Sequence, residues 1–97
     1  MPASSARIET ASGSRYLQQL CKHWSHKLDV AYTPIAGRIA FPDGRVCTLA
    51  ADDTGLALRL EANDDEALVR GQSVIVDHLK RFAFRESLDN VGWQRVG

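Results

Sequence analysis

Polar and apolar residues alternate along several short runs of this chain, and this period of two is typical of β-strands with one buried face. Alternations of this kind predict six strands, over residues 5–10, 28–32, 37–41, 45–51, 56–62 and 91–95. Pro42-Asp43-Gly44 separates the third run from the fourth. Because proline presets φ and glycine accepts a positive φ, these three residues predict a tight hairpin turn.

Two longer segments have the helical period instead, with apolar residues three and four positions apart. The first covers residues 14–27, and its apolar stripe consists of Tyr16, Leu17, Leu20, Cys21 and Trp24. The second begins near Asn63, which is followed three residues later by Glu66 in the manner of a capping box, and it runs to about residue 84. Gly71 is a small inward position that would let this helix approach a sheet closely.

The resulting element order is β-α-β-β-β-β-α-β. A mostly antiparallel sheet with only two helices predicts an α+β fold, a two-layer sandwich with both helices on one face of the sheet. The chain has 97 residues, which suits one domain with one core over residues 1–97. We expect residues 1–4 to be frayed, because the first alternation begins after them.

Charge and composition exclude several classes of function. Twelve basic residues balance twelve acidic ones, and the predicted core faces contain most of the aromatic residues, so we expect no binding to nucleic acid. The apolar runs are far shorter than the ~20 residues that span a bilayer, and we expect no membrane segment. Met1–Ser5 does not resemble a secretory signal, which predicts a cytoplasmic protein with Cys21 and Cys47 reduced and buried.

The predicted first helix carries Cys21-Lys22-His23-Trp24-Ser25-His26-Lys27, which superficially resembles a metal or nucleophile cluster. Cys21 and His23 differ by about 200° around a helix and cannot share one ion. His23 and His26 are three residues apart but lack the frame of a zinc-binding helix. Both cysteines fall on inward faces, and no nucleophile elbow or nucleotide-binding loop occurs. We therefore expect no catalytic residue, no metal and no cofactor.

The predicted second helix places His78, Arg81 and Arg85 along one flank, at i, i+3 and i+7. Arginine binds carboxylates and phosphates with two parallel hydrogen bonds, so this row is a candidate anion-binding edge. The alternative is ordinary surface pairing, of Arg81 with Asp77 and of Arg85 with Glu86 or Asp89.

The sequences RYLQQLCKHWSHK and HLKRFAFRE within these helices resemble a bacterial family of unknown function. Its members occur alone, or beside or fused to siderophore-interacting flavin-dependent ferric reductases. The resemblance implies a context of bacterial iron acquisition, without a mechanism. If the two segments serve one site, side-by-side helices would form a cationic groove from His23, His26, Lys27, His78, Arg81 and Arg85.

Such a groove would suit an anionic small molecule, for example a ferric siderophore or a carboxylate-bearing metabolite. The first hypothesis is therefore a non-enzymatic binding or accessory protein, with a siderophore-interacting flavoprotein as a possible partner. The second is a protein-interaction module, a homodimer formed through an edge strand or the Phe84 surface. A metal-dependent enzyme has the least support.

Overall fold

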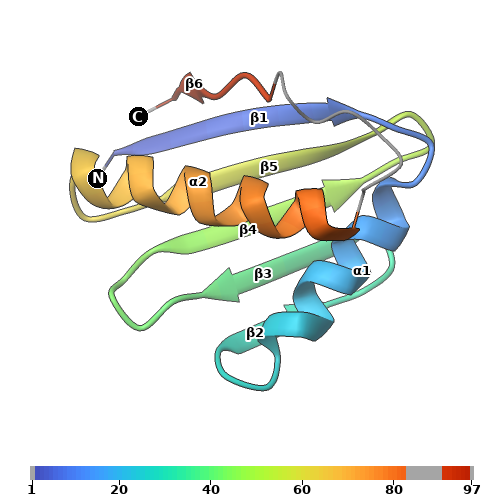
Figure 1. Ribbon diagram of the computed structural model, residues 1–97, viewed down its shortest axis with the longest axis horizontal. Helices are drawn as coiled ribbons and strands as arrows, with labels where there is room; N and C mark the ends of the chain where they lie inside the picture. The colour runs from blue at the N-terminus through green and yellow to red at the C-terminus, as the bar shows by residue number, and fades with distance from the viewer. Residues whose placement is uncertain (1, 83–90, 97) are drawn as a thin grey trace.

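The computed structural model describes residues 2–82 and 91–96 of the chain, which form one antiparallel sheet and two helices. The elements are β1 (Ala3–Glu9), α1 (Gly13–Trp24), β2 (Asp29–Tyr32), β3 (Ala36–Ala40), β4 (Val46–Ala51), β5 (Gly55–Glu61), α2 (Asp65–Phe82) and β6 (Gln94–Arg95). The strands lie in the order β2-β3-β4-β5-β1-β6, and each pair is antiparallel (Figure 1). The predicted α+β fold and element order are confirmed.

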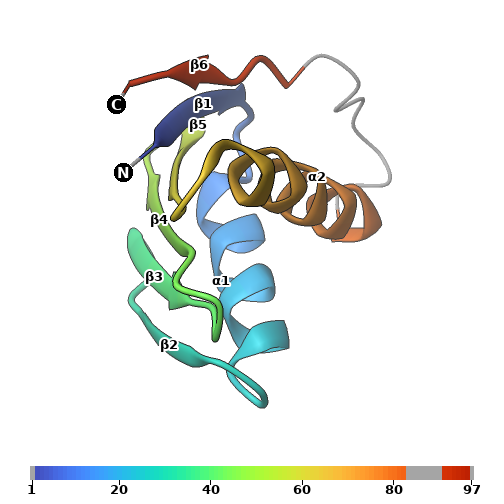
Figure 2. The ribbon, with the colours of Figure 1, turned by 90° about the vertical axis from the view of Figure 1, so that its left-hand side faces the viewer.

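Both helices cover the same face of the sheet, and neither helix covers the opposite face (Figure 2). The core lies between the two layers, where alternate strand residues meet the helix stripes. Its largest fully buried apolar side chains are Leu17, Leu20, Ile39, Leu56, Leu58, Leu60, Leu68, Ile75 and Leu79. Because apolar burial is the main favourable contribution to folding, this layer positions everything else in the molecule.

β1 begins earlier than the sequence predicted, so the expectation of a frayed start is wrong for residues 3 and 4. Ala3 pairs with Glu61 of β5 and is buried. Ser4 is fully buried on the helix side, where its hydroxyl accepts a hydrogen bond from Nε2 of Gln72 on α2 at 2.8 Å. Met1 lies outside the described residues.

α1 ends at Trp24, three residues before the predicted end. The backbone N–H of Ser25 donates to the carbonyl of Cys21, and the Ser25 hydroxyl donates to the carbonyl of Lys22. The N–H of Lys27 then donates to Trp24, as in a turn. The last two bonds satisfy carbonyls that the end of a helix leaves without intrahelical partners.

α2 begins at Asp65, and the predicted capping residue was wrong by one position. The carboxylate of Asp64 accepts the backbone N–H of Ala67 at 2.8 Å, which is the bond of an N-cap. The amide of Asn63 instead donates to the carbonyl of Asp43 at 2.9 Å and ties the helix start to the β3–β4 turn. Neither of the two described helices is long and apolar enough to cross a membrane.

The two glycine predictions are confirmed. Gly44 adopts a φ of 94° in the turn between β3 and β4. A Cβ at Gly71 would lie 2.7 Å from Cδ2 of Leu60, so the missing side chain lets α2 lie close to β5.

Candidate functional site

The end of α1 and the second half of α2 meet above the sheet, and this contact brings two histidines together. The ring centroids of His23 and His78 are 5.3 Å apart. His78 also lies against Trp24 at 4.6 Å, and His23 lies 6.0 Å from Phe82. We call these four side chains the histidine cluster. The two helices are therefore neighbours, as predicted, and they meet at His23 and His78.

The hydrogen bonding of His78 defines which of its nitrogens is available. Its Nδ1 lies 2.7 Å from the carbonyl oxygen of Val74, one turn earlier in α2. A carbonyl only accepts hydrogen bonds, so Nδ1 carries a proton and donates it. In the neutral ring, Nε2 is then an acceptor, and in the protonated ring it becomes a second donor.

The surroundings of His23 oppose its protonation. Loss of water beside the neighbouring rings lowers the pKa of His23, and the main electrostatic contributions come from His78, Arg81, Lys27 and His26, which lower it further. Every one of these four groups is basic. A local positive potential of this kind favours the approach of an anion.

The remaining predicted residues surround the cluster less regularly. His26 and Lys27 are exposed and lie in the turn after α1, because the helix ends before the predicted residue 27. Arg81 is exposed in the last turn of α2. Arg85 lies outside the described residues, as does Phe84. Predicted binding by these side chains stays a prediction.

The surface-pairing alternative is not observed for Arg81 within the part of the chain that the structure describes. None of the ion pairs there joins Arg81 to Asp77, and none includes Lys27. Two cations beside the histidine cluster are therefore not neutralised by a described carboxylate. An anion would gain charge-assisted hydrogen bonds from them.

The described residues contain no group of three or more histidine, cysteine or acidic side chains arranged to hold a metal ion. Cys21 and Cys47 are buried free thiols, as predicted, and are not part of the cluster. Burial raises the pKa of Cys21 to about 11 and that of Cys47 to about 12. Such thiols are poor nucleophiles, because the thiolate is the reactive form.

A cavity lies elsewhere, on the face of the sheet opposite the helices. It has a volume of about 660 Å³, and its lining includes Arg7, Ala57 and Arg59. Sequence reasoning singled out none of these residues. The sequence pattern that could have indicated this face is the alternation of alanine and arginine along the strands. Such a pattern identifies one face of a sheet but does not show that the face is hollowed.

Comparison with known proteins agrees with the fold and assigns the family. The NMR structure of PA4090 from Pseudomonas aeruginosa is 40% identical in sequence, covers 97% of this chain and 96% of that chain, and superposes with a TM-score of 0.81. The two proteins share an α+β architecture with an open antiparallel sheet. The model of the family described as "Uncharacterized protein conserved in bacteria (DUF2218)" matches residues 5–94, and the chain belongs to this family.

A search of curated proteins gives no match. The implied link to siderophore-interacting ferric reductases stays a prediction.

Proposed function

We propose that this protein is a non-enzymatic binding or accessory protein that recognises an anionic ligand at the histidine cluster, in the context of iron–siderophore metabolism. The observation that carries the proposal is the 5.3 Å approach of His23 and His78 from two helices that are distant in sequence. The binding groups are His23, His26, Lys27, His78, Arg81 and Arg85.

The electrostatics favour an anion over a cation. The basic groups around His23 act together to disfavour its proton, so a bound negative charge would relieve their mutual repulsion. The Nε2 atom of His78 and the guanidinium of Arg81 supply N–H donors for carboxylate or catecholate oxygens. Binding should strengthen as the pH falls, because an anion stabilises the protonated imidazoles.

The shape of the site limits the kind of ligand. His23 is exposed at the surface, so a ligand bound beside it would remain partly hydrated. A bulky, multiply charged complex such as a ferric siderophore suits this geometry better than a small apolar metabolite. The family resemblance of this protein supports a siderophore-interacting flavoprotein as the partner that delivers or accepts the complex.

The test is an NMR titration with a gallium(III)-loaded catecholate siderophore, a diamagnetic substitute for the ferric complex, with citrate as a simple carboxylate probe. We expect saturable shifts of the backbone amides around His23 and His78. Arg81→Gln should weaken binding about tenfold, the effect of losing one charge-assisted hydrogen bond. Lys80→Gln, which removes a neighbouring exposed cation, is the matched control.

Two results would overturn the proposal. One is the absence of saturable shifts with either probe at pH 6 and pH 8. The other is an equal loss of affinity in Arg81→Gln and Lys80→Gln, because that outcome means attraction by net charge without a defined site.

A second candidate function is self-association through the exposed edge of the sheet. β2 is an edge strand, and the hairpin to β3 exposes Ile35 at 66% and Tyr32 at 41%. Unpaired strand edges pair readily with another chain. Sedimentation velocity should then show a dimer that Ile35→Lys dissociates, and a monomer at all concentrations would exclude this function.

A further inference from the structure

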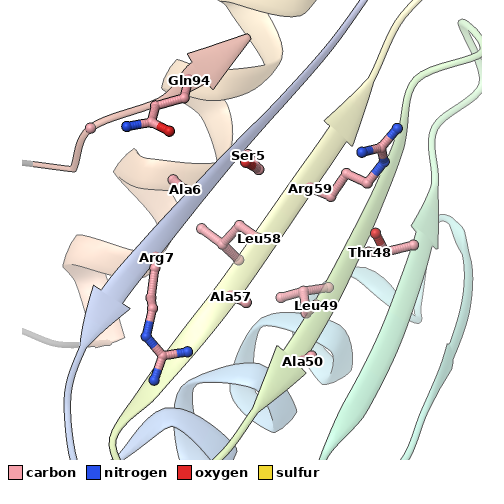
Figure 3. A pocket seen from close by; sticks show the side chains of 11 residues that line it. Ser5, Ala6, Arg7, Thr48, Leu49, Ala50, Ala57, Leu58, Arg59 and Gln94 are labelled. Atoms are coloured by element: carbon pink, nitrogen blue, oxygen red, sulfur yellow. The ribbon is translucent and has the colours of Figure 1, made fainter. Parts of the chain in front are cut away.

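The face of the sheet opposite the helices holds the cavity of about 660 Å³ described above. Figure 3 shows Arg7 on β1 and Arg59 on β5 on either side of Ala57, with Gln94 of β6 beside Ser5. This face is remote from the histidine cluster, because the sheet lies between them (Figure 2).

The strand register explains the hollow. Ala57 of β5 lies opposite Ala50 of β4, and Ala50 lies opposite Ala36 of β3, so three alanines form a row across the sheet. The adjacent row on the same face has longer polar side chains, in the order Thr48, Arg59, Ser5 and Gln94. A row of methyl groups beside a row of longer side chains leaves a trench that runs across the strands.

Strand stability does not account for these alanines. Alanine is depleted in strands, and sheet surfaces gain from β-branched and aromatic cross-strand pairs. The alanine row gives up those contacts on the central strands β4 and β5. What it provides is space, and a volume of about 660 Å³ lies within the range of small-molecule sites.

The polar groups beside the trench are available to a ligand. Arg59 is about half exposed, and its Nε donates to Glu61 at 3.3 Å, while its two terminal nitrogens make no hydrogen bond to a described residue. The side chains of Ser5, Thr48 and Gln94 likewise make none within the described part of the chain. Aligned terminal N–H groups of arginine are suited to a carboxylate.

Arg7, at the other end of the trench, already makes hydrogen bonds within the protein. Its Nη2 donates to both carboxylate oxygens of Asp52 and to the hydroxyl of Thr54, at 2.9–3.2 Å, and its Nε donates to Glu9. The guanidinium beside Asp52 holds the pKa of that carboxyl well below its usual range, so this pair stays ionised and neutralised. Among the described residues that line the trench, Arg59 is thus the cation whose terminal nitrogens are available, and Arg7 forms a wall.

We infer that this trench is a second binding site, for a small monocarboxylate with a flat or extended apolar body. The carboxylate binds the terminal nitrogens of Arg59, assisted by the hydroxyls of Thr48 and Ser5. The apolar body lies on the methyl groups of Ala50 and Ala57. The site is independent of the histidine cluster and of the anion proposed there.

The test is a titration of the ¹⁵N-labelled protein with benzoate and hexanoate, each compared with its uncharged amide. We expect saturable shifts at Ser5, Thr48 and Ala57, and affinities for the acids about tenfold above those for the amides. His78→Gln should leave these affinities unchanged, which separates this site from the proposed function.

Two variants and one matched control locate the binding groups. Arg59→Gln should weaken carboxylate binding about tenfold or more. Ala57→Leu should abolish binding of both probes by filling the trench, at an exposed face where folding tolerates it. Arg38→Gln is the control, since Arg38 is in register with Thr48 on the same face but does not line the cavity.

Three outcomes would overturn the inference. The first is the absence of saturable shifts with either acid. The second is an equal loss of affinity in Arg59→Gln and Arg38→Gln. The third is a dimer that Ala57→Leu converts to a monomer, which would make the trench an interface between two copies of the chain.

Discussion

His23 and His78 lie with their ring centroids 5.3 Å apart. Loss of water beside the neighbouring rings lowers the pKa of His23 below the ordinary 6.5, and the basic groups of His78, Arg81, Lys27 and His26 lower it further. As the pH falls towards 6.5, His23 is therefore less protonated in the folded state than in the unfolded state. Stability that is present above pH 6.5 is lost as the pH falls through the lowered pKa. His23→Gln should flatten this dependence, measured as urea midpoints between pH 8 and pH 5.

The control for this prediction is His26→Gln. His26 is exposed in the turn after α1 and makes no ring contact with a described residue. It should keep most of the pH dependence of the natural protein, because His26 makes the smallest of the four electrostatic contributions to the lowered pKa of His23. Because His23 is itself exposed, its effect should be modest, and a His23→Gln variant with an unchanged pH slope would contradict the prediction.

A second prediction concerns the contact between α1 and the β4–β5 turn. A Cβ at Gly13 would lie 2.5 Å from the carbonyl oxygen of Gly55, and a backbone atom cannot move aside cheaply. Gly13→Ala should lower the free energy of unfolding by about 1–2 kcal/mol, since strain outweighs the gain in helix propensity. Thermal unfolding should shift by several degrees.

Gly92→Ala is the matched control, because nothing lies within 4 Å of a Cβ at Gly92. Its melting temperature should stay close to that of the natural protein. If both variants melt alike, the close approach of Gly13 and Gly55 does not limit stability.

Local patterns were enough to predict most of the fold. The alternation of Leu56, Leu58 and Leu60 identified β5 because its two faces have opposite environments, one in the core and one in solvent. The stripe through Leu20 and Trp24 identified the buried side of α1 in the same way. These patterns are local, so they can be interpreted without knowing which elements are neighbours in space.

The spatial relations between distant elements could not be read from the sequence. Insertion of β1 between β5 and β6 depends on pairing across the whole chain, and no local pattern encodes it. The trench depends on the register that sets Ala50 opposite Ala57, which a shift of one residue would destroy. For the histidine cluster, helical spacing predicted which face of each helix carries His23 and His78. Their contact depends on how α1 packs against α2, which the spacing does not specify.

A third prediction concerns the hydrogen bond between β1 and α2. Ser4 is fully buried, and its hydroxyl accepts the amide of Gln72. Ser4→Ala should cost about 1 kcal/mol, the net value of a typical intramolecular hydrogen bond. Ser5→Ala, on the opposite face of the same strand, should have almost no effect on the urea midpoint, and equal losses in the two variants would show that the bond to Gln72 contributes nothing.

The last prediction concerns the reactivity of the two thiols. Burial raises the pKa of Cys21 to about 11 and that of Cys47 to about 12, so neither is a thiolate at pH 8 in the folded protein. Modification by a disulfide reagent should therefore be far slower in buffer than in urea, where both thiols should react together.

The rate in buffer should report transient opening of the fold, because the reagent reaches the thiols only in open molecules. Gly13→Ala populates those molecules more, so it should accelerate modification, by about tenfold for a loss of about 1.4 kcal/mol, while Gly92→Ala should not. Rapid stoichiometric modification of the natural protein at pH 8 would mean that at least one thiol is accessible in the folded state, because α1 packs less tightly on β3 and β4 than the structure shows.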